Sequence, residues 1–207
     1  MYIIAGCNGS GKTTASYTVL PEILKCSQFV NSDEFAKGLN PFNPNDASVR
    51  ASRYMLIKIK YLIDRNMDFG VETTLATRSL KKIALAAQKK GYFVTVLYFW
   101  LESPALAIER VRARVQAGGH DIPTDVILRR YDKGLKYFFD DYSQFADRWI
   151  LADNSNYPYT VVAQGWKDSM IVRDNPKYEQ IRKYADSIVV KEPAAGAGSE
   201  APEDEDR

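Results

Sequence analysis

Residues 6–13 read Gly-Cys-Asn-Gly-Ser-Gly-Lys-Thr and match the phosphate-binding pattern G-x-x-x-x-G-K-[ST] at every fixed position. An apolar run before the motif reads as a buried strand, and a helix is expected from Thr13 onward. There the glycines let the backbone curl so that N–H groups face a polyphosphate, and the helix N-terminus adds partial positive charge. The alternative is a glycine-rich turn before a helix, but the joint occurrence of strand, loop, Lys-Thr and helix argues against coincidence.

The motif supplies groups for a nucleotide and for a metal ion. The Lys12 ammonium would neutralise the β- and γ-phosphate oxygens, and the Thr13 hydroxyl is the expected Mg²⁺ ligand. Thr14 has two interpretations, a contact with the α-phosphate or a place in the first helical turn. ATP is the default nucleotide because the chain lacks a guanine-reading Asn-Lys-x-Asp stretch. The expected nucleotide contacts are Gly6, Asn8, Gly9, Ser10, Gly11, Lys12, Thr13 and Thr14.

Asp33 follows a predicted strand and Glu72 lies at the end of another, and open parallel sheets bind ligands beyond the carboxyl ends of their strands. Asp33 could orient a substrate hydroxyl and accept its proton; alternatively it could cap the helix that follows. Glu72 could hold Mg²⁺ or hydrogen-bond the acceptor; alternatively it could be a strand end that faces solvent. Function is favoured at Glu72 because a charge next to a buried strand is costly unless it is used or paired.

Arginines gather in the segment 110–131, which is interpreted as a lid over the phosphates. Arg110 and Arg114 are four apart and share one helix face, and Arg129 lies on the next helix, beyond a Gly118-Gly119 turn. Guanidinium groups stabilise the negative charge that spreads over a transferring phosphoryl group. Arg114 and Arg129 are the expected catalytic arginines. The alternative is a solvated basic surface paired with acids.

Alternating strand and helix patterns predict an α/β fold with a five-stranded parallel sheet flanked by helices, of the nucleoside-kinase type of phosphate-loop protein. One domain is expected over residues 1–191, with a small C-terminal hairpin and helix at about 157–188. Strands are expected at residues 3–5, 28–31, 69–73, 93–101 and 148–151, with hairpin strands at 159–162 and 170–172. Helices are expected at residues 13–19, ending near Pro21, and at 33–39, 46–65, 78–90, 104–117, 124–139 and 176–185.

Charge is distributed unevenly along the 207 residues. The chain holds 28 basic and 26 acidic residues, and residues 192–207 account for one and six of them, which leaves 27 and 20, a net charge of +7. A basic folded part suits an anionic substrate. The acidic segment has little to bury and is expected to be a disordered, solubilising tail; an autoinhibitory strip over the basic site is the alternative.

Composition excludes several classes of function. Cys7 and Cys26 do not make a disulfide framework, and a single histidine, His120, without a Cys/His cluster argues against zinc. No apolar run is long enough to span a membrane, and no basic run interleaved with aromatic residues indicates nucleic-acid binding. We therefore expect a cytoplasmic protein that acts on a small molecule.

Taken together, these motifs resemble the zeta toxin family of P-loop kinases, and more closely its stand-alone bacterial members. The resemblance extends from residue 1 to about residue 155. The phosphate loop alone is not specific to this family, whereas the Gly-Gly-His-x-Ile-Pro block and the Arg-Arg-Tyr after it are much more so. The residues that carry it are 6–14, 31–34, 38–41, 72–75, 118–123 and 129–131.

The resemblance implies roles for individual residues. Asp33 would take the proton from a sugar hydroxyl, and Lys12 and the lid arginines would bind the transferred phosphate. The implied acceptor is the 3′-hydroxyl of UDP-N-acetylglucosamine, and an antitoxin protein is the implied partner. Zeta toxins place an arginine soon after the third-strand threonine, where this chain has Ala76, with Arg78 two residues on. The expected acceptor contacts are Asp33, Glu72, Thr74 and Arg78.

These observations favour a Mg²⁺-ATP-dependent small-molecule kinase. Thr13 and Glu72 would organise the metal, Lys12, Arg114 and Arg129 would neutralise the phosphates, and Asp33 would activate the acceptor hydroxyl. Two alternatives stay open. One is an ATPase without a phosphate acceptor, in which a carboxylate orients water; the other is a nucleotide-dependent interaction module whose lid signals to a partner.

Overall fold

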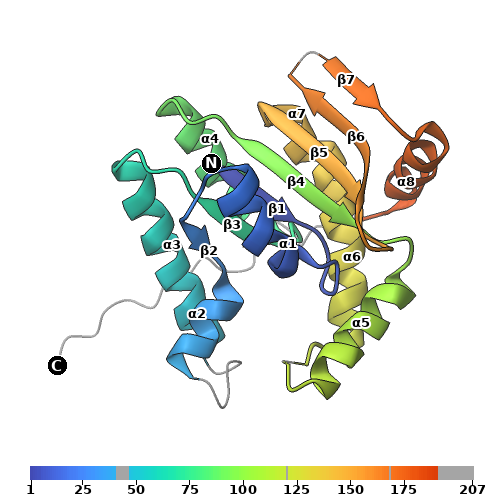
Figure 1. Cartoon of the computed structure of the whole chain (residues 1–207), viewed down its shortest axis with the longest axis horizontal. Coiled ribbons are helices and arrows are strands. Elements are labelled where there is room, and N and C mark those ends of the chain that lie inside the picture. The colour runs from blue at the N-terminus through green and yellow to red at the C-terminus, as the bar shows by residue number, and fades with distance from the viewer. Residues whose placement is uncertain (41–46, 120, 168, 191–207) are drawn as a thin grey trace.

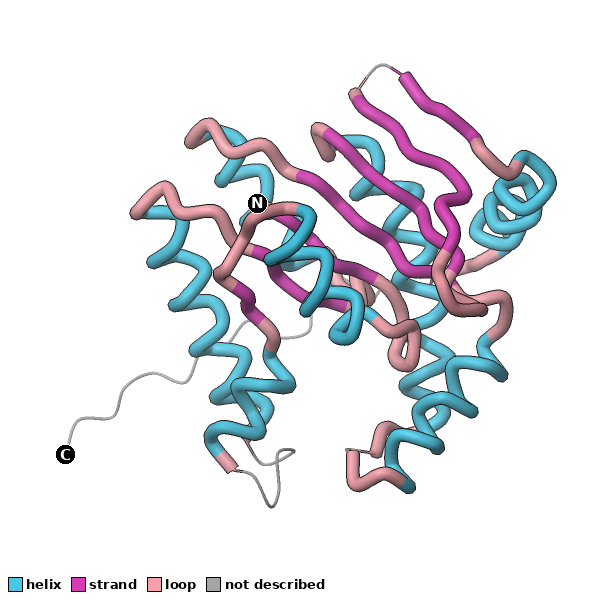
Figure 2. Tube along the Cα trace, viewed as in Figure 1, coloured by secondary structure: helices cyan, strands magenta, loops and turns pink. Residues whose placement is uncertain are grey.

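The computed structural model describes residues 1–40, 47–119, 121–167 and 169–190 (Figures 1 and 2). His120 and the expected acidic tail lie outside the described residues. The strands are β1 (Tyr2–Ala5), β2 (Phe29–Val30), β3 (Gly70–Thr73), β4 (Thr95–Trp100), β5 (Arg148–Asp153), β6 (Thr160–Trp166) and β7 (Ser169–Val172). The helices are α1 (Lys12–Thr18), η1 (Val19–Ile23), α2 (Ser32–Leu39), α3 (Ser48–Asp64), α4 (Ser79–Lys89), α5 (Pro104–Gln116), α6 (Thr124–Tyr137), η2 (Phe138–Tyr142), α7 (Ser143–Phe145) and α8 (Asn175–Ser187).

One sheet of seven strands runs through the described part of the chain, in the order β2-β3-β1-β4-β5-β6-β7. The first five strands are parallel, as expected, and β6 and β7 continue the sheet with antiparallel pairing. The expected sheet of five strands is therefore two strands too short. The short connection 154–159 lets β6 turn back directly onto β5, since antiparallel neighbours need no crossover helix.

The two faces of the sheet are covered unequally. In β1, Ile3 belongs to the large core under α3, α4, α6 and α8, whereas Ile4 belongs to a smaller core with Val19 and Leu20 of η1. Successive strand residues point to opposite faces, so this alternation assigns the two layers. Figure 1 shows α1 in front of the sheet, and α4 and α6 behind it. The carboxyl ends of β1, β2 and β3 lie at the same end of the sheet, and the segments that follow them form the candidate site.

Two features at the ends of helices bear on the predictions. The first helix was expected at residues 13–19, and α1 ends at Thr18, close to that prediction; the π-helical turn η1 continues the coil beyond it, and there the Leu24 N–H donates to the Val19 carbonyl. A wider turn accommodates a proline that an α-helix interior would exclude. Asp33 does not cap α2: Asn31 is the N-cap, and its side-chain oxygen accepts from the Asp33 N–H at 2.8 Å. The Asp33 carboxylate is thereby left available for other contacts.

Gly165 in β6 provides a test of this sheet extension. A Cβ at Gly165 would lie 2.4 Å from Cε2 of Trp149, which is buried in the large core. Gly165→Ala should therefore lower the free energy of unfolding by about 1–3 kcal/mol through overpacking, measured by urea denaturation. Gly38→Ala is the matched control, since its Cβ would meet nothing within 4 Å and alanine favours helix α2. Equal stability of the two variants would contradict the packing of β6 on Trp149.

Candidate nucleotide and phosphotransfer site

The loop between β1 and α1 has the geometry of an anion cradle. Gly6 has φ +141°, and a Cβ there would lie 2.3 Å from the Phe99 carbonyl oxygen, so only glycine fits. Gly11 caps α1 in the left-handed conformation with φ 80°. Lys12, the first residue of α1, is buried, and its Nζ donates to the Cys7 carbonyl at 2.8 Å. The loop thus folds around its own lysine.

The interior of this loop fits a phosphate chain. Ser10 is fully buried, and its Oγ finds no hydrogen-bond partner within the described structure. Buried polar groups without partners are rare and mark strain or the place of a ligand. A donor hydroxyl, a lysine ammonium and a helix N-terminus around one glycine turn suit a polyphosphate. The residues present therefore fit the nucleotide that the motif predicts.

Glu72, in strand β3, joins three segments of the site. Its carboxylate accepts hydrogen bonds from Thr13 Oγ1 at 2.8 Å and from Asn31 Nδ2 at 2.8 Å. The Lys12 ammonium lies 3.8 Å from Glu72 Oε1, and the Glu72 side chain is 9% exposed. The structure thus joins Lys12, Thr13 and Glu72, three residues that the sequence assigned to the site. Asn31 was not among the assigned residues, although it ends the second strand beside Asp33.

Opposing effects act on the pKa of Glu72. Burial raises it, the Lys12 ammonium and the Thr13 hydrogen bond lower it, and the neighbouring charge of Asp33 raises it again. The net direction is upward. A carboxylate of this kind gains from any further cation, because burial penalises its charged form. Together with the Thr13 hydroxyl, Glu72 offers the oxygen ligands that Mg²⁺ prefers.

A cavity of about 320 Å³ opens beside the phosphate loop. Lys12 and Asn8 line it from the loop, Asp33 from α2, and Glu72 and Thr74 from β3 and the residue that follows it. Asp33 is exposed rather than sealed beneath apolar side chains. Asp33, Glu72 and Arg130 all line this cavity, and the charge of Asp33 acts to raise the pKa values of both Glu72 and Arg130.

Arg130 is the arginine in the lining of this cavity. Its Nη1 donates to the Asn8 side-chain oxygen at 3.1 Å. Burial lowers the pKa of the guanidinium, Asp33 raises it and Arg129 lowers it, and the net direction is downward. It nonetheless stays charged at neutral pH, since an arginine pKa begins far above 7. Arg129 was the predicted catalytic arginine of this helix, but it is exposed and outside the cavity lining, whereas Arg130 is part of it.

Helix α6 holds Arg130 in place through two close contacts. The Tyr131 hydroxyl donates to the Leu101 carbonyl at 2.6 Å. A Cβ at Gly134 would lie 2.4 Å from the Thr74 carbonyl oxygen, so α6 rests on the backbone just after β3. Ile127, Tyr131 and Leu135 are buried on the inner side of α6. This apolar spacing, read with Gly134, is the sequence signal that could have selected Arg130.

The remaining expected residues lie outside the cavity lining. The Nε of Arg78 forms an ion pair with Asp141 at 2.7 Å, and its guanidinium lies over the Tyr137 ring. Arg114 is exposed near the end of α5, and Thr14 is exposed in the first turn of α1. The described structure therefore brings together the carboxylates and Lys12, but not these three side chains.

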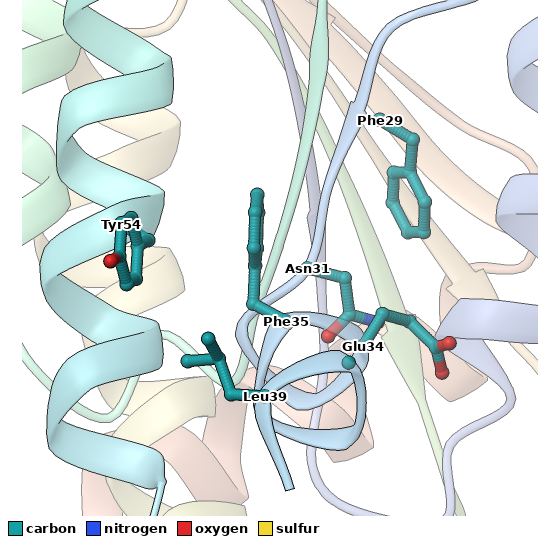
Figure 3. Close-up of a pocket in the computed structure, with 7 residues that line it drawn as sticks. Phe29, Asn31, Glu34, Phe35, Leu39 and Tyr54 are labelled. Carbon is teal, nitrogen blue, oxygen red and sulfur yellow. The ribbon is translucent and has the colours of Figure 1, made fainter. Parts of the chain in front are cut away.

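A second, apolar pocket of about 430 Å³ lies between α2 and α3. Figure 3 shows the rings of Tyr54, Phe35 and Phe29 in a row across it, with Leu39 below. Among the described residues that line it, the charged side chain is the carboxylate of Glu34. This lining suits a polyphosphate less well than the cavity that contains Lys12.

Comparison with known proteins matches the zeta toxin family model to residues 1–156. The chain belongs to the zeta toxin family. The matched segment contains the phosphate loop, both carboxylates and the two lid helices. An uncharacterized protein of Haemophilus influenzae is 30% identical over 126 residues, which cover 61% of this chain and 88% of that protein. The family match and the fold agree with the phosphotransferase activity that the sequence predicts.

Solved structures share the fold of this zeta toxin family member at low sequence identity. A chain in a crystal structure of AvrRxo1-ORF1:-ORF2 with ATP is 14% identical with a TM-score of 0.68, and the match covers 93% of this chain and 65% of that one. This protein thus spans slightly less than two thirds of the matched chain. A structure of the PezAT toxin-antitoxin system of Streptococcus pneumoniae is 14% identical with a TM-score of 0.60, covering 90% and 84%.

The raised pKa of Glu72 has a measurable consequence. The folded protein binds a proton at Glu72 more tightly than the unfolded chain, so the contribution of Glu72 to the free energy of unfolding should fall as pH rises above its ordinary pKa of 4.5. Subtracting the free energy of unfolding of Glu72→Gln from that of wild type should reveal this decline in urea titrations. Glu109→Gln, at an exposed position, is the control and should give a flat difference. A flat difference for Glu72→Gln would contradict the burial of its charge.

Proposed function

We propose that this zeta toxin family member transfers the γ-phosphate of Mg²⁺-ATP to a hydroxyl of a small molecule such as a sugar nucleotide. One observation carries the proposal: Lys12, Glu72 and Arg130 share one cavity with the exposed carboxylate of Asp33. A phosphate cradle alone is common to all P-loop proteins, but a free carboxylate across from it supplies a base for an acceptor hydroxyl.

In the proposed reaction the acceptor hydroxyl donates a hydrogen bond to the Asp33 carboxylate. The acceptor oxygen attacks the γ-phosphorus, the bond between the γ-phosphorus and the β,γ-bridging oxygen breaks, and ADP leaves with the electron pair. Asp33 receives the proton of the hydroxyl. Lys12 and Arg130 neutralise the charge that develops on the phosphate oxygens. Arg114 and Arg129 would join them through movement of the helices that carry them.

Thr13 and Glu72 are the proposed holders of Mg²⁺ in this site. Their hydrogen bond of 2.8 Å leaves a hydroxyl and a carboxylate oxygen close together. Mg²⁺ held there would offset the negative charge of the phosphates. The carboxylate of Glu72 is oriented by Asn31 as well, so this chain fixes the oxygen ligand from two sides.

The acceptor side of the cavity is lined by Thr74, Ser52 and Thr77 in addition to Asp33. These hydroxyls suit an acceptor rich in hydrogen-bonding groups, and UDP-N-acetylglucosamine is the candidate that the family resemblance names. Arg78 is proposed as an acceptor contact from the rim. To reach it, Arg78 would have to exchange its ion pair with Asp141 for a ligand anion.

Two further properties belong to the same proposal. The PezAT and AvrRxo1-ORF1:-ORF2 structures are complexes of two proteins, which supports an antitoxin-like partner for this chain. A cytoplasmic location is proposed on the composition of the chain. Among the described residues, no helix combines the length and apolar character that crossing a bilayer requires.

The decisive experiment supplies Mg²⁺-ATP and a pool of nucleotide sugars and other metabolites, and searches by mass spectrometry for a compound that gains one phosphate. Asp33→Asn should lower kcat for that product by about 10²–10⁴-fold, because the amide cannot accept the proton, while ADP affinity changes little. ATP hydrolysis without stimulation by any acceptor would favour the ATPase alternative. Full activity of Asp33→Asn would favour the interaction module and contradict the kinase mechanism.

The neighbouring arginines of α6 give a matched comparison. Arg130→Ala should lower kcat by about 10²–10³-fold, because the guanidinium lines the cavity and stabilises the transferring phosphate. Arg129→Ala, one residue away and exposed, should lose less activity than Arg130→Ala, because the Arg129 side chain is outside the cavity lining. Steady-state kinetics with the identified acceptor measures both. Equal large losses would mean that closure recruits both arginines.

A further inference from the structure

Asn154 is the first residue after β5, and its side chain lies against the phosphate loop. Its side-chain Nδ2 donates to the Ser10 carbonyl at 2.8 Å. A Cβ at Gly11 would lie 2.5 Å from the same nitrogen, so the amide sits directly on the Ser10–Gly11 peptide. Nothing in the sequence links position 154 to position 10, because 144 residues separate them.

This contact fixes the orientation of one peptide group. In a trans peptide the carbonyl and the following N–H point in opposite directions. Because Asn154 holds the Ser10 carbonyl, the Gly11 N–H points away from Asn154. Gly11 has φ +80°, and glycine crosses readily between backbone regions, so this peptide could otherwise rotate at low cost. The amide of Asn154 thus selects one of two orientations of a donor in the phosphate cradle.

Asn154 is itself held by Arg110 of α5. Arg110 Nη1 donates to the Asn154 carbonyl at 2.8 Å, and Nη2 donates to the Ser155 carbonyl at 2.7 Å. A two-pronged contact of this kind needs the planar fork of arginine. Arg110 was predicted to belong to a lid over the phosphates, but its guanidinium donates to the backbone carbonyls of Asn154 and Ser155.

A buried carboxylate secures the other end of the same segment. Asp153 Oδ1 accepts from the Ser155 N–H at 2.8 Å, and Asp153 Oδ2 accepts from Lys177 of α8. Burial alone would raise the pKa of Asp153, but the hydrogen bonds from Lys177 and Ser155 outweigh it and lower the pKa. The C-terminal helix, in which the sequence offered no functional signal, therefore connects to the phosphate loop through residues 153–155.

We propose that Asn154, held by Arg110, is a positioning residue that keeps the Ser10–Gly11 peptide in the orientation that receives the polyphosphate. The inference rests on the proposed function, since it concerns the nucleotide cradle of the same site. Asn154 acts through the backbone of the loop and touches no reacting atom in this account. Its effect should therefore fall on the affinity for the phosphate chain, whatever the acceptor.

The test measures binding of ADP and of inorganic tripolyphosphate, each with Mg²⁺, by titration calorimetry. Asn154→Asp keeps the shape of the side chain but turns a carboxylate oxygen toward the Ser10 carbonyl, and should weaken both ligands by about 30-fold. Asn154→Ala loses the hydrogen bond alone and should weaken both by about 10-fold. A variant that is merely unstable would show its defect in the thermal midpoint, which is measured in parallel.

Arg110 supplies a second, independent arm. Arg110→Met keeps the apolar stem and removes both carbonyl contacts, and should weaken ADP about 10-fold, whereas Arg110→Lys should recover part of the loss. The double variant with Asn154→Ala should bind no more weakly than the worse single variant, since both act on one peptide. Glu109→Ala, an exposed neighbour on α5, should bind like wild type.

Each outcome separates the inference from the proposed function. If wild type binds both ligands and the Asn154 variants bind them equally well, the positioning role is overturned while the kinase proposal stands. A loss with ADP but not with tripolyphosphate would mean that Asn154 serves the nucleoside, which also overturns the inference. If wild type binds neither ligand, the nucleotide site itself is wrong and both proposals fall.

Discussion

One buried carboxylate connects the segments that form the candidate site of this protein. Glu72 accepts hydrogen bonds from Thr13 after the phosphate loop and from Asn31 at the start of α2, and its oxygen lies 3.8 Å from the Lys12 ammonium. Burying such a charge is unfavourable unless it is paired and hydrogen-bonded, so these partners are needed to keep Glu72 buried. The ends of β1, β2 and β3 are therefore fixed relative to one another by one side chain, and the cavity between them inherits that order.

The sheet translates this local constraint into a reaction site. Parallel strands deliver their carboxyl ends to one edge, so the loop after β1, the cap after β2 and the turn after β3 converge without any contact between them in the sequence. The half of the sheet that β6 and β7 extend contributes none of the described residues of the cavity lining. It contacts the phosphate loop through Asn154, whose neighbour Asp153 is bonded to Lys177 of α8. One half of the sheet therefore supplies the cavity residues, and the other half supports the loop between β1 and α1.

Sequence alone was informative where function depends on short stretches of chain. The phosphate loop is recognisable from its glycines and lysine. Asp33 and Glu72 were predicted because each lies at or just after the end of a strand. The choice between Arg129 and Arg130 could not be made in that way, since the packing of Ile127 and Tyr131 decides which side of α6 faces the cavity. Asn154 was beyond prediction, because its role is a contact between segments distant in the sequence. The extra strands β6 and β7 were recognised as a hairpin, but not their attachment to β5, which depends on tertiary pairing.

The glycine at position 134 limits how the enzyme can move. Because α6 rests on the Thr74 backbone at Gly134 and the Tyr131 hydroxyl donates to the Leu101 carbonyl, this part of α6 is held against the sheet. Arg130 lies beside these contacts, so its place in the cavity lining is set by packing, whereas Arg114 is exposed near the end of α5. Under the proposed mechanism, one guanidinium would therefore already line the cavity before any nucleotide binds.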